Sequence, residues 1–269
     1  MTDIDISVYV CHYVLMDLRT PQQQIELFHL LFLKQLGEKI DKQHFALKGG
    51  CNLRFFLKSI RYSEDIDLDI KITAKDTLKT QVSKLLLSPP FQQVLRTKKL
   101  YITDVNPAKQ TDTTQRWKLK ILGPATRLPI PTKIEFSRRE ITEGFRFEAI
   151  DSELITGYQL YPVLCNHYEI NSALIQKIEA LIYRSETQAR DIFDIFHLLN
   201  FGAKLTTIST ELKSKLGLAI ENALSISCAD YKSQVVSYLK DDYRDFFGTK
   251  SKWNEMQEKV IEVFENETH

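Results

Sequence analysis

The feature that most constrains this chain is a Gly-Gly turn, Gly49-Gly50, followed in the sequence by two aspartates, Asp65 and Asp67. The glycines end a short apolar run and precede apolar residues at helical spacing, and residues 65–70 alternate acidic and apolar side chains, which predicts a half-buried strand. Residues i and i+2 of a strand point to the same face, so the two carboxylates converge. We therefore expect a strand, a tight turn, a helix and a second strand that presents both carboxylates together.

These residue types suit a metal-bound nucleoside triphosphate. Two carboxylates on one face repel each other unless a cation lies between them, and Mg²⁺ takes oxygen ligands from one or two carboxylates and from substrate phosphates. Glycine lets the backbone approach an anion, and the N–H groups at the start of the next helix attract phosphate. We expect Mg²⁺ or Mn²⁺ at Asp65 and Asp67 and phosphate at Gly49 and Gly50. The alternative is an acidic strand edge, and Asp69, further along this face, is expected to be a solvated or supporting group.

Later elements supply further candidates for the same site. Glu135 lies on a predicted strand and could complete a two-metal site if that strand lies beside the aspartates. Lys177, on the first helix of the second half, could contact the triphosphate, and Asp191 or Asp194, on the next helix, could act as an organiser or a base. The alternatives are an exposed strand glutamate and a pair of salt-bridged helices.

Three polar residues near the Gly-Gly turn are candidate phosphate ligands. Arg54, like Arg61, could grip a phosphate or pair with Glu64. Ser63 could donate to a phosphate oxygen or cap the strand. The residue types alone leave both alternatives open.

Hydrophobic periodicity divides the chain into a mixed α/β half and a helical half. Thr20 and Pro21 form a good helix start, a second helix over 76–87 is expected to close at Pro89-Pro90, and Ser185 and Gln188 have the spacing of a capping box. Strand-like runs follow over 99–105, 117–122 and 130–136, strand propensity fades after Phe147, and the chain is helical from Tyr168. We expect an α+β fold with domains 1–160 and 161–269.

Composition excludes some classes of protein and leaves nucleic-acid binding to local patches. Lys plus Arg number 36 and Asp plus Glu number 35, so the net charge gives no indication of a nucleic-acid partner. Arg116, Lys118 and Lys120 nevertheless alternate along one predicted strand, which gives either a phosphate track or a solvated face. The four cysteines form no CxxC pair, no apolar run reaches the length of a membrane span and no signal peptide is evident, so we expect a cytoplasmic location.

Two blocks of sequence resemble the AbiEii-type nucleotidyltransferases, which are toxins of type IV toxin–antitoxin, abortive-infection systems and share the DNA polymerase β-like fold. The first block is Lys48-Gly49-Gly50 with Arg61-x-Ser63-x-Asp65-Ile66-Asp67-Leu68. The second is Lys177-Ile178-Glu179-Ala180-Leu181, Arg184 and Ala189-Arg190-Asp191-Ile192-Phe193-Asp194, with Lys133-Ile134-Glu135 similar to a late acidic strand of the family. The resemblance covers roughly residues 21 to 200.

The resemblance implies an N-terminal nucleotidyltransferase domain with a mixed sheet, to which the helical domain contributes Lys177 and Asp191 or Asp194. It also implies transfer of a nucleotidyl group from an NTP to an acceptor, with the 3′ end of tRNA as the expected acceptor, a role in phage defence and a cognate antitoxin as partner. Cys51 stands where the family usually has Thr or Ser, so nucleotide grip is expected to differ because a thiol is a weak donor.

Three other functions remain open at this level. The chain could bind a nucleotide or a protein partner without turnover, it could transfer a nucleotide to a protein, or it could be a metal-dependent nuclease. The retained aspartate pair argues against a pure binding module, because such a module has no need for a repulsive pair. The Gly-Gly turn suits a triphosphate better than a duplex backbone.

Overall fold

A computed structural model describes residues 20–138, 144–205 and 208–268. The N-terminal segment before Thr20 lies outside the described residues, and the first half of the described chain contains both helices and strands. Its elements are α2 (Pro21–Lys39), η1 (Lys42–His44), β1 (Phe45–Lys48), α3 (Gly49–Phe56), β2 (Ile66–Ile70), α4 (Lys75–Leu87), α5 (Pro89–Thr97), β3 (Tyr101–Gln110), β4 (Thr114–Leu122), β5 (Ile130–Ser137), β6 (Phe145–Ala149), α6 (Ser152–Gly157) and β7 (Leu164–Tyr168).

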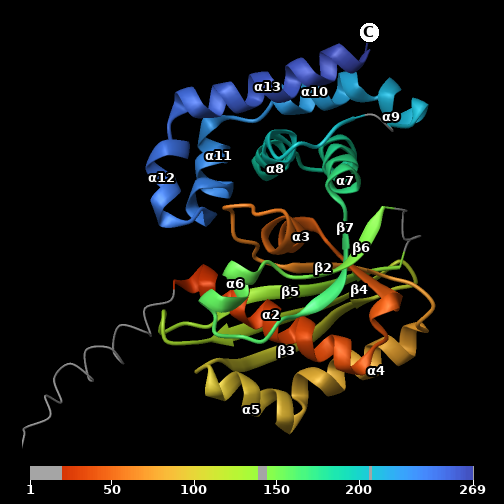
Figure 1. The fold of residues 1–269 in the computed structure, drawn as a ribbon, viewed down its shortest axis with the longest axis vertical. Helices are drawn as coiled ribbons and strands as arrows, with labels where there is room; N and C mark the ends of the chain where they lie inside the picture. Colours follow the sequence, from red (N-terminus) through yellow and green to blue (C-terminus); the bar gives the residue numbers. More distant parts are fainter. Residues whose placement is uncertain (1–19, 139–143, 206–207, 269) are drawn as a thin grey trace, which may run out of the picture.

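The strands form one seven-stranded mixed sheet in the order β3-β4-β5-β2-β1-β7-β6. The pairs β2–β5 and β1–β7 are parallel, and the other neighbours are antiparallel. Helices α2, α4 and α5 lie on one side of the sheet and α3 on the other (Figure 1). The alternation expected for β2 is confirmed, because Ile66, Leu68 and Ile70 are buried in the core between the sheet and the helices.

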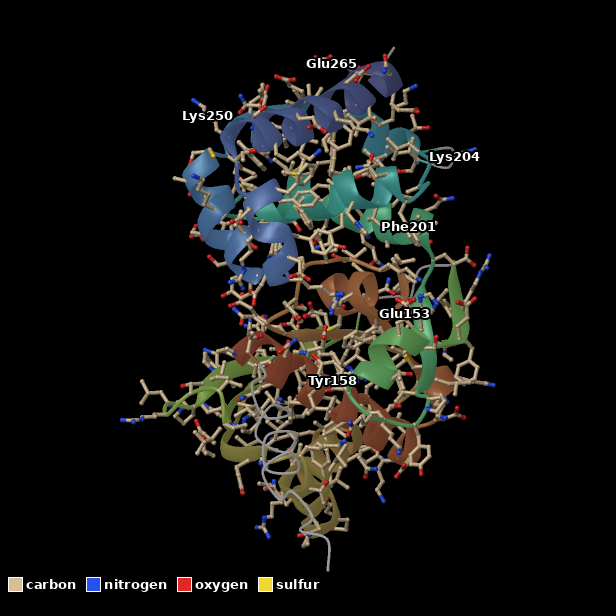
Figure 2. The ribbon with its side chains drawn as sticks, turned by 60° about the vertical axis from the view of Figure 1, so that its left-hand side comes forward. Glu153, Tyr158, Phe201, Lys204, Lys250 and Glu265 are labelled. Carbon is tan, nitrogen blue, oxygen red and sulfur yellow. The ribbon has the colours of Figure 1, made fainter. Side chains whose placement is uncertain are left out.

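The second half is helical and stacks above α3 (Figure 1). Figure 2 shows it from another side, with Phe201, Lys204, Lys250 and Glu265 labelled on it. Its elements are α7 (Ile170–Tyr183), α8 (Ala189–Asn200), α9 (Thr210–Ser214), α10 (Leu216–Leu224), α11 (Cys228–Gln234), η2 (Val236–Tyr238), α12 (Asp241–Phe247) and α13 (Lys250–Thr268).

Helix α3 belongs to both halves of the molecule. Its residues Cys51 and Phe55 are buried in the core of the sheet half, whereas Leu53 and, just after the helix, Leu57 are buried in the core of the helical half. A helix with apolar residues on both sides must bury both of them, and α3 does so by lying between the two cores. The Gly-Gly turn at the start of α3 is thereby held at the junction of the halves.

The α+β class and the order of the halves are confirmed, and some local expectations differ from the structure. Thr20 does cap α2, and its hydroxyl accepts from the Gln23 N–H. The helix expected over 76–87 is confirmed as α4, which ends at Leu87 just before the prolines. Pro89 and Pro90 then occupy the first two positions of a further helix, α5, which was not expected and where a missing N–H costs nothing.

The other differences concern the start of the helical half. Helix α8 begins at Ala189 with Gln188 at its N-cap position, and no side-chain cap bond is made there, so the Ser185–Gln188 capping box is wrong. Strand β7 follows the point where strand propensity was expected to fade, and through its pairing with β1 the sheet runs on to Tyr168. Sequence alone could not reveal β7, because its polar residues are satisfied by partners distant in the chain.

Candidate active site

The Gly-Gly turn places the N-terminus of α3 against the second aspartate. Gly49 has φ +65°, and a Cβ built on it would lie 2.8 Å from Asp67 Oδ2. A Cβ built on Gly50 would lie 2.6 Å from Ser63 Oγ. Both positions therefore require glycine, the first for its backbone conformation and for space, the second for space. No side chain caps this helix start, so its first N–H groups have no side-chain acceptor at the N-cap.

The expected neighbourhood of Asp67 and Glu135 is confirmed by the register of the sheet. Strand β5 lies beside β2, and Asp67 pairs with Glu135 across the two strands. Burial is the main cause that raises the pKa of Asp67, and the charges of Asp65 and Glu135 raise it further. Burial also raises the pKa of Asp65, although Lys133 opposes this shift. The charged form of Asp67 is therefore destabilised both by burial and by the two neighbouring carboxylates.

Two of these carboxylates are balanced by cations on the same sheet. Lys133 Nζ lies 2.7 Å from Asp65 Oδ2, and Arg116 Nε donates to Glu135 Oε2 at 2.6 Å. Within the described residues, no group of three or more His, Cys, Asp or Glu side chains has the geometry of a metal site. The donor set therefore fits a divalent cation held by the Asp65 and Asp67 pair together with phosphate oxygens, as is usual for Mg²⁺, better than an all-protein cage.

A pocket of about 610 Å³ lies between the two halves and exposes Asp67. The sheet half contributes Lys48, Gly49, Asp67, Asp69 and Ser137, and helix α7 contributes Lys177 and Arg184, the residue that caps its C-terminus. The helix start, the carboxylate and two cations are thus brought to one cavity. Asp65 does not line this pocket, although it interacts electrostatically with Asp67.

The expected residues of the helical half form a buried ion network. Asp194, fully buried, accepts from Arg61 Nε and Nη2 at 3.0 and 2.7 Å and lies 2.7 Å from Lys177 Nζ. Asp191, also fully buried, lies 3.1 Å from Lys177 and 3.0 Å from Arg184. The sequence left open whether these aspartates act as organiser or base. The contacts favour the role of organiser over that of base, because both carboxylates form ion pairs with Lys and Arg side chains.

The pKa of Asp194 supports this assignment. Burial alone would raise it, but Arg61 and Lys177 outweigh burial and hold the pKa well below its usual range. A general base works best when its pKa lies near the working pH. The lowered pKa of Asp194 lies far from that range, so Asp194 is poorly suited to act as a base. Arg61, for which pairing with Glu64 or phosphate was considered, is instead the clamp that joins the loop before β2 to α8.

Arg54 and Ser63, the other phosphate candidates, make their contacts within the protein. Arg54 donates to Glu26 at 2.6 and 3.2 Å and is buried, and Glu26 also accepts from Tyr158 (labelled in Figure 2). Ser63 donates to the Asp65 carbonyl at 2.8 Å, so it shapes the turn into β2. Arg54 and Ser63 do not line the pocket that holds Asp67.

Cys51 is buried away from the pocket as well. Its thiol donates to the Asp65 carbonyl at 3.3 Å and lies 3.6 Å from His29 Nδ1. Burial, followed by the charge of Asp67, raises the pKa of this thiol well above its usual value. The Cys51 side chain therefore packs beneath the turn, and only the backbone N–H of Cys51 could contribute to a phosphate site at the helix start.

Two residues without an assigned role in the sequence complete the site. Lys48, which pairs in register with Asp67, has its Nζ 2.5 Å from Asp69 Oδ1, and Tyr168 donates to Asp69 Oδ2 at 2.7 Å. Asp69 is thus buried and supports Lys48 rather than being solvated. The position of Lys48 directly before the glycines could have indicated from the sequence that it belongs to the site. Tyr168 lies 99 residues from Asp69, so no sequence pattern could have indicated their contact.

A mixed sheet with a carboxylate pair at a glycine-started helix, facing cations from a helical half, defines this chain as a protein of the nucleotidyltransferase class. The sequence model described as "Nucleotidyl transferase AbiEii toxin, Type IV TA system" matches residues 31–262. The chain therefore belongs to the AbiEii nucleotidyltransferase toxin family.

Solved structures share this fold at low sequence identity. JHP933 from Helicobacter pylori is 19% identical, with a TM-score of 0.57, over 94% of this chain and 97% of that one. A structure described as a "putative nucleotidyltransferase from H. pylori" is also 19% identical, with a TM-score of 0.55, over 89% and 94% of the two chains. No curated protein sequence gives a significant match. Within the described residues, none of the helices has the length and apolar character that crossing a membrane requires.

Proposed function

We propose that this protein transfers a nucleotidyl group from an NTP to an RNA acceptor, with Mg²⁺ or Mn²⁺ as its cofactor. The observation that carries the proposal is the contact of Asp67 with the glycine-started helix α3, in a pocket that Lys177 and Arg184 also line. Phosphate oxygens need donors and cations, and a metal needs carboxylates. This cavity offers all three within one region.

The residues of the pocket have distinct roles in this proposal. The N–H groups at Gly49 and Gly50 donate to phosphate oxygens, because a helix start attracts anions. Lys177, held in place by Asp191 and Asp194, offers its ammonium group to the phosphates, and such a preorganised charge is most effective where negative charge develops. Mg²⁺ bound by Asp65 and Asp67 would stabilise the attacking and leaving oxygens of an in-line displacement.

The 3′ end of tRNA is the acceptor that we propose, and inhibition of growth in phage defence is the proposed consequence. Membership of a toxin family supports a toxic activity and a cognate antitoxin as partner. Near-zero net charge places any RNA contact on local basic surfaces rather than on the whole molecule.

A transfer assay with α-³²P-labelled NTPs tests the proposal. Each NTP is incubated with the protein, Mg²⁺ and total RNA, in parallel with Asp67→Asn and with Asp245→Asn, an exposed aspartate on α12, as the matched control. Label on a tRNA-sized band that is lost only with Asp67→Asn supports the proposal. Label on protein, RNA cleavage, or NTP binding without transfer to any acceptor would each replace it with one of the three other functions.

A further inference from the structure

The face of the sheet opposite α4 carries an array of basic side chains beside the carboxylates. On β4, Trp117 is buried and its indole N–H donates to Ser83 of α4, so the alternating residues Arg116, Lys118 and Lys120 point away from that helix. Lys118 and Lys120 are exposed. We define Lys109, Arg116, Lys118, Lys120 and Lys133 as the basic sheet face.

The basic sheet face is continuous with the candidate active site. Arg116 contacts Glu135, the register partner of Asp67, and Lys133 contacts Asp65. Residues paired across a sheet share a face, so the row from Asp67 through β5 to β4 runs along one surface. Cations therefore begin at the carboxylate pair and extend toward β3.

The arrangement of charges on this surface is unfavourable for the isolated protein. Lys118 pairs directly with Lys133, and Lys109 pairs directly with Arg116. Like charges directly opposite each other destabilise a sheet. Acidic neighbours offset only part of this repulsion, since Asp65 contacts Lys133, Glu135 contacts Arg116, and Asp104 lies opposite Lys120.

We propose that the basic sheet face binds the phosphate backbone of the RNA acceptor and leads its end to Asp65 and Asp67. A row of phosphates relieves the two like-charge pairs, and the repeat of about 6.8 Å between residues i and i+2 of a strand suits contacts to successive phosphates of an extended strand. This inference rests on the proposed function, because it assigns the acceptor path of the same site.

Fluorescence anisotropy with a short single-stranded RNA, measured over a series of salt concentrations without NTP, tests the inference. The variant is Lys118→Ala/Lys120→Ala, and the matched control is Lys79→Ala/Lys84→Ala, two exposed lysines of α4 on the other side of the sheet. For two lost phosphate contacts we expect affinity to fall about tenfold and the slope of log K against log salt to become shallower by about 1.4. The control variant should match the wild type, and Lys118→Arg/Lys120→Arg should keep the slope.

The outcomes separate this inference from the proposed function. An unchanged slope and affinity in the alanine variant, or no RNA binding by the wild type, overturns the acceptor path even if transfer is observed. Binding of polyglutamate in place of RNA would show that the face fits an acidic protein, and would also overturn it. A weakened, less salt-dependent variant supports the path even if no NTP is transferred, and in that case only the proposed function fails.

Discussion

Asp194→Asn removes the negative charge that two buried cations share. Asp194 has no exposed surface and accepts a bidentate contact from Arg61 at 3.0 and 2.7 Å, with Lys177 at 2.7 Å. Asparagine keeps the shape of the side chain, but it leaves Arg61 without its paired carboxylate and Lys177 in contact with Asp191 alone. The change therefore isolates the electrostatic contribution of the network from its packing.

The expected loss of stability is large. Removing one partner of a buried ion pair costs about 3–5 kcal/mol, a substantial share of the 5–15 kcal/mol that stabilises a typical protein. For a chain of this size, about 2–4 °C per kcal/mol predicts a fall in Tm of roughly 6–20 °C. Because the paired aspartate has a lowered pKa, its contribution is complete above the unfolded-state pKa and is lost as pH falls through the folded-state pKa. The difference from the wild type should therefore be full at pH 7 and shrink below about pH 4.

Denaturant unfolding and thermal melting at pH 7 measure this loss, with Asp245→Asn as the control for an exposed aspartate, expected within about 0.5 kcal/mol of the wild type. A double-mutant cycle with Arg61→Met should give a coupling free energy above about 1.5 kcal/mol. A Tm within about 1 °C of the wild type, together with no coupling, would refute the view that this network joins the two halves.

Three further substitutions test the site itself. Asp67→Asn should abolish transfer yet raise the Tm of the metal-free protein by about 1–4 °C at pH 7. The pKa of Asp67 is raised in the folded protein, so its charged form destabilises the fold as pH rises, and asparagine removes that charge. Melting with and without Mg²⁺ measures this effect, and a Tm lower than that of the wild type would contradict it. Gly49→Ala should destabilise by about 1–2 kcal/mol and reduce transfer, whereas Gly217→Ala, a helical glycine with open space around it, should be neutral or stabilising in the same denaturant titration. Cys51→Ser should leave the KM for NTP within about twofold, because its side chain is buried beneath the turn; a larger change in steady-state kinetics would show that residue 51 contacts nucleotide.

The sequence could predict the part of the site that is local in the chain. The turn at Gly49, the strand that carries Asp67 and the alternation along β2 depend on neighbours a few residues apart, and periodicity reports such spacing. The adjacency of Glu135 followed from one conditional step, the placing of its strand beside β2, and the sheet register satisfies that condition.

The long-range partners could not be predicted from spacing. Arg61 and Asp194 are 133 residues apart, and nothing in the local pattern of either residue names the other. Arg54 shows the same limit, because its pairing with Glu26 depends on how α2 packs against α3. Strand β7 was missed for a related reason, since its role comes from pairing with β1 rather than from its own alternation.

The long-range contacts also restrict how an acceptor can reach the pocket. Lys177 and Arg184 of the helical half line one side, and the loop before β2 is tied to that half by the Arg61–Asp194 pair and by the Tyr62 N–H, which donates to the Tyr238 carbonyl at 2.8 Å. A large acceptor that approached through this tied side would have to break a buried ion pair. The exposed side chains of β4 impose no such cost, so the approach over the basic sheet face is the one that leaves the network intact.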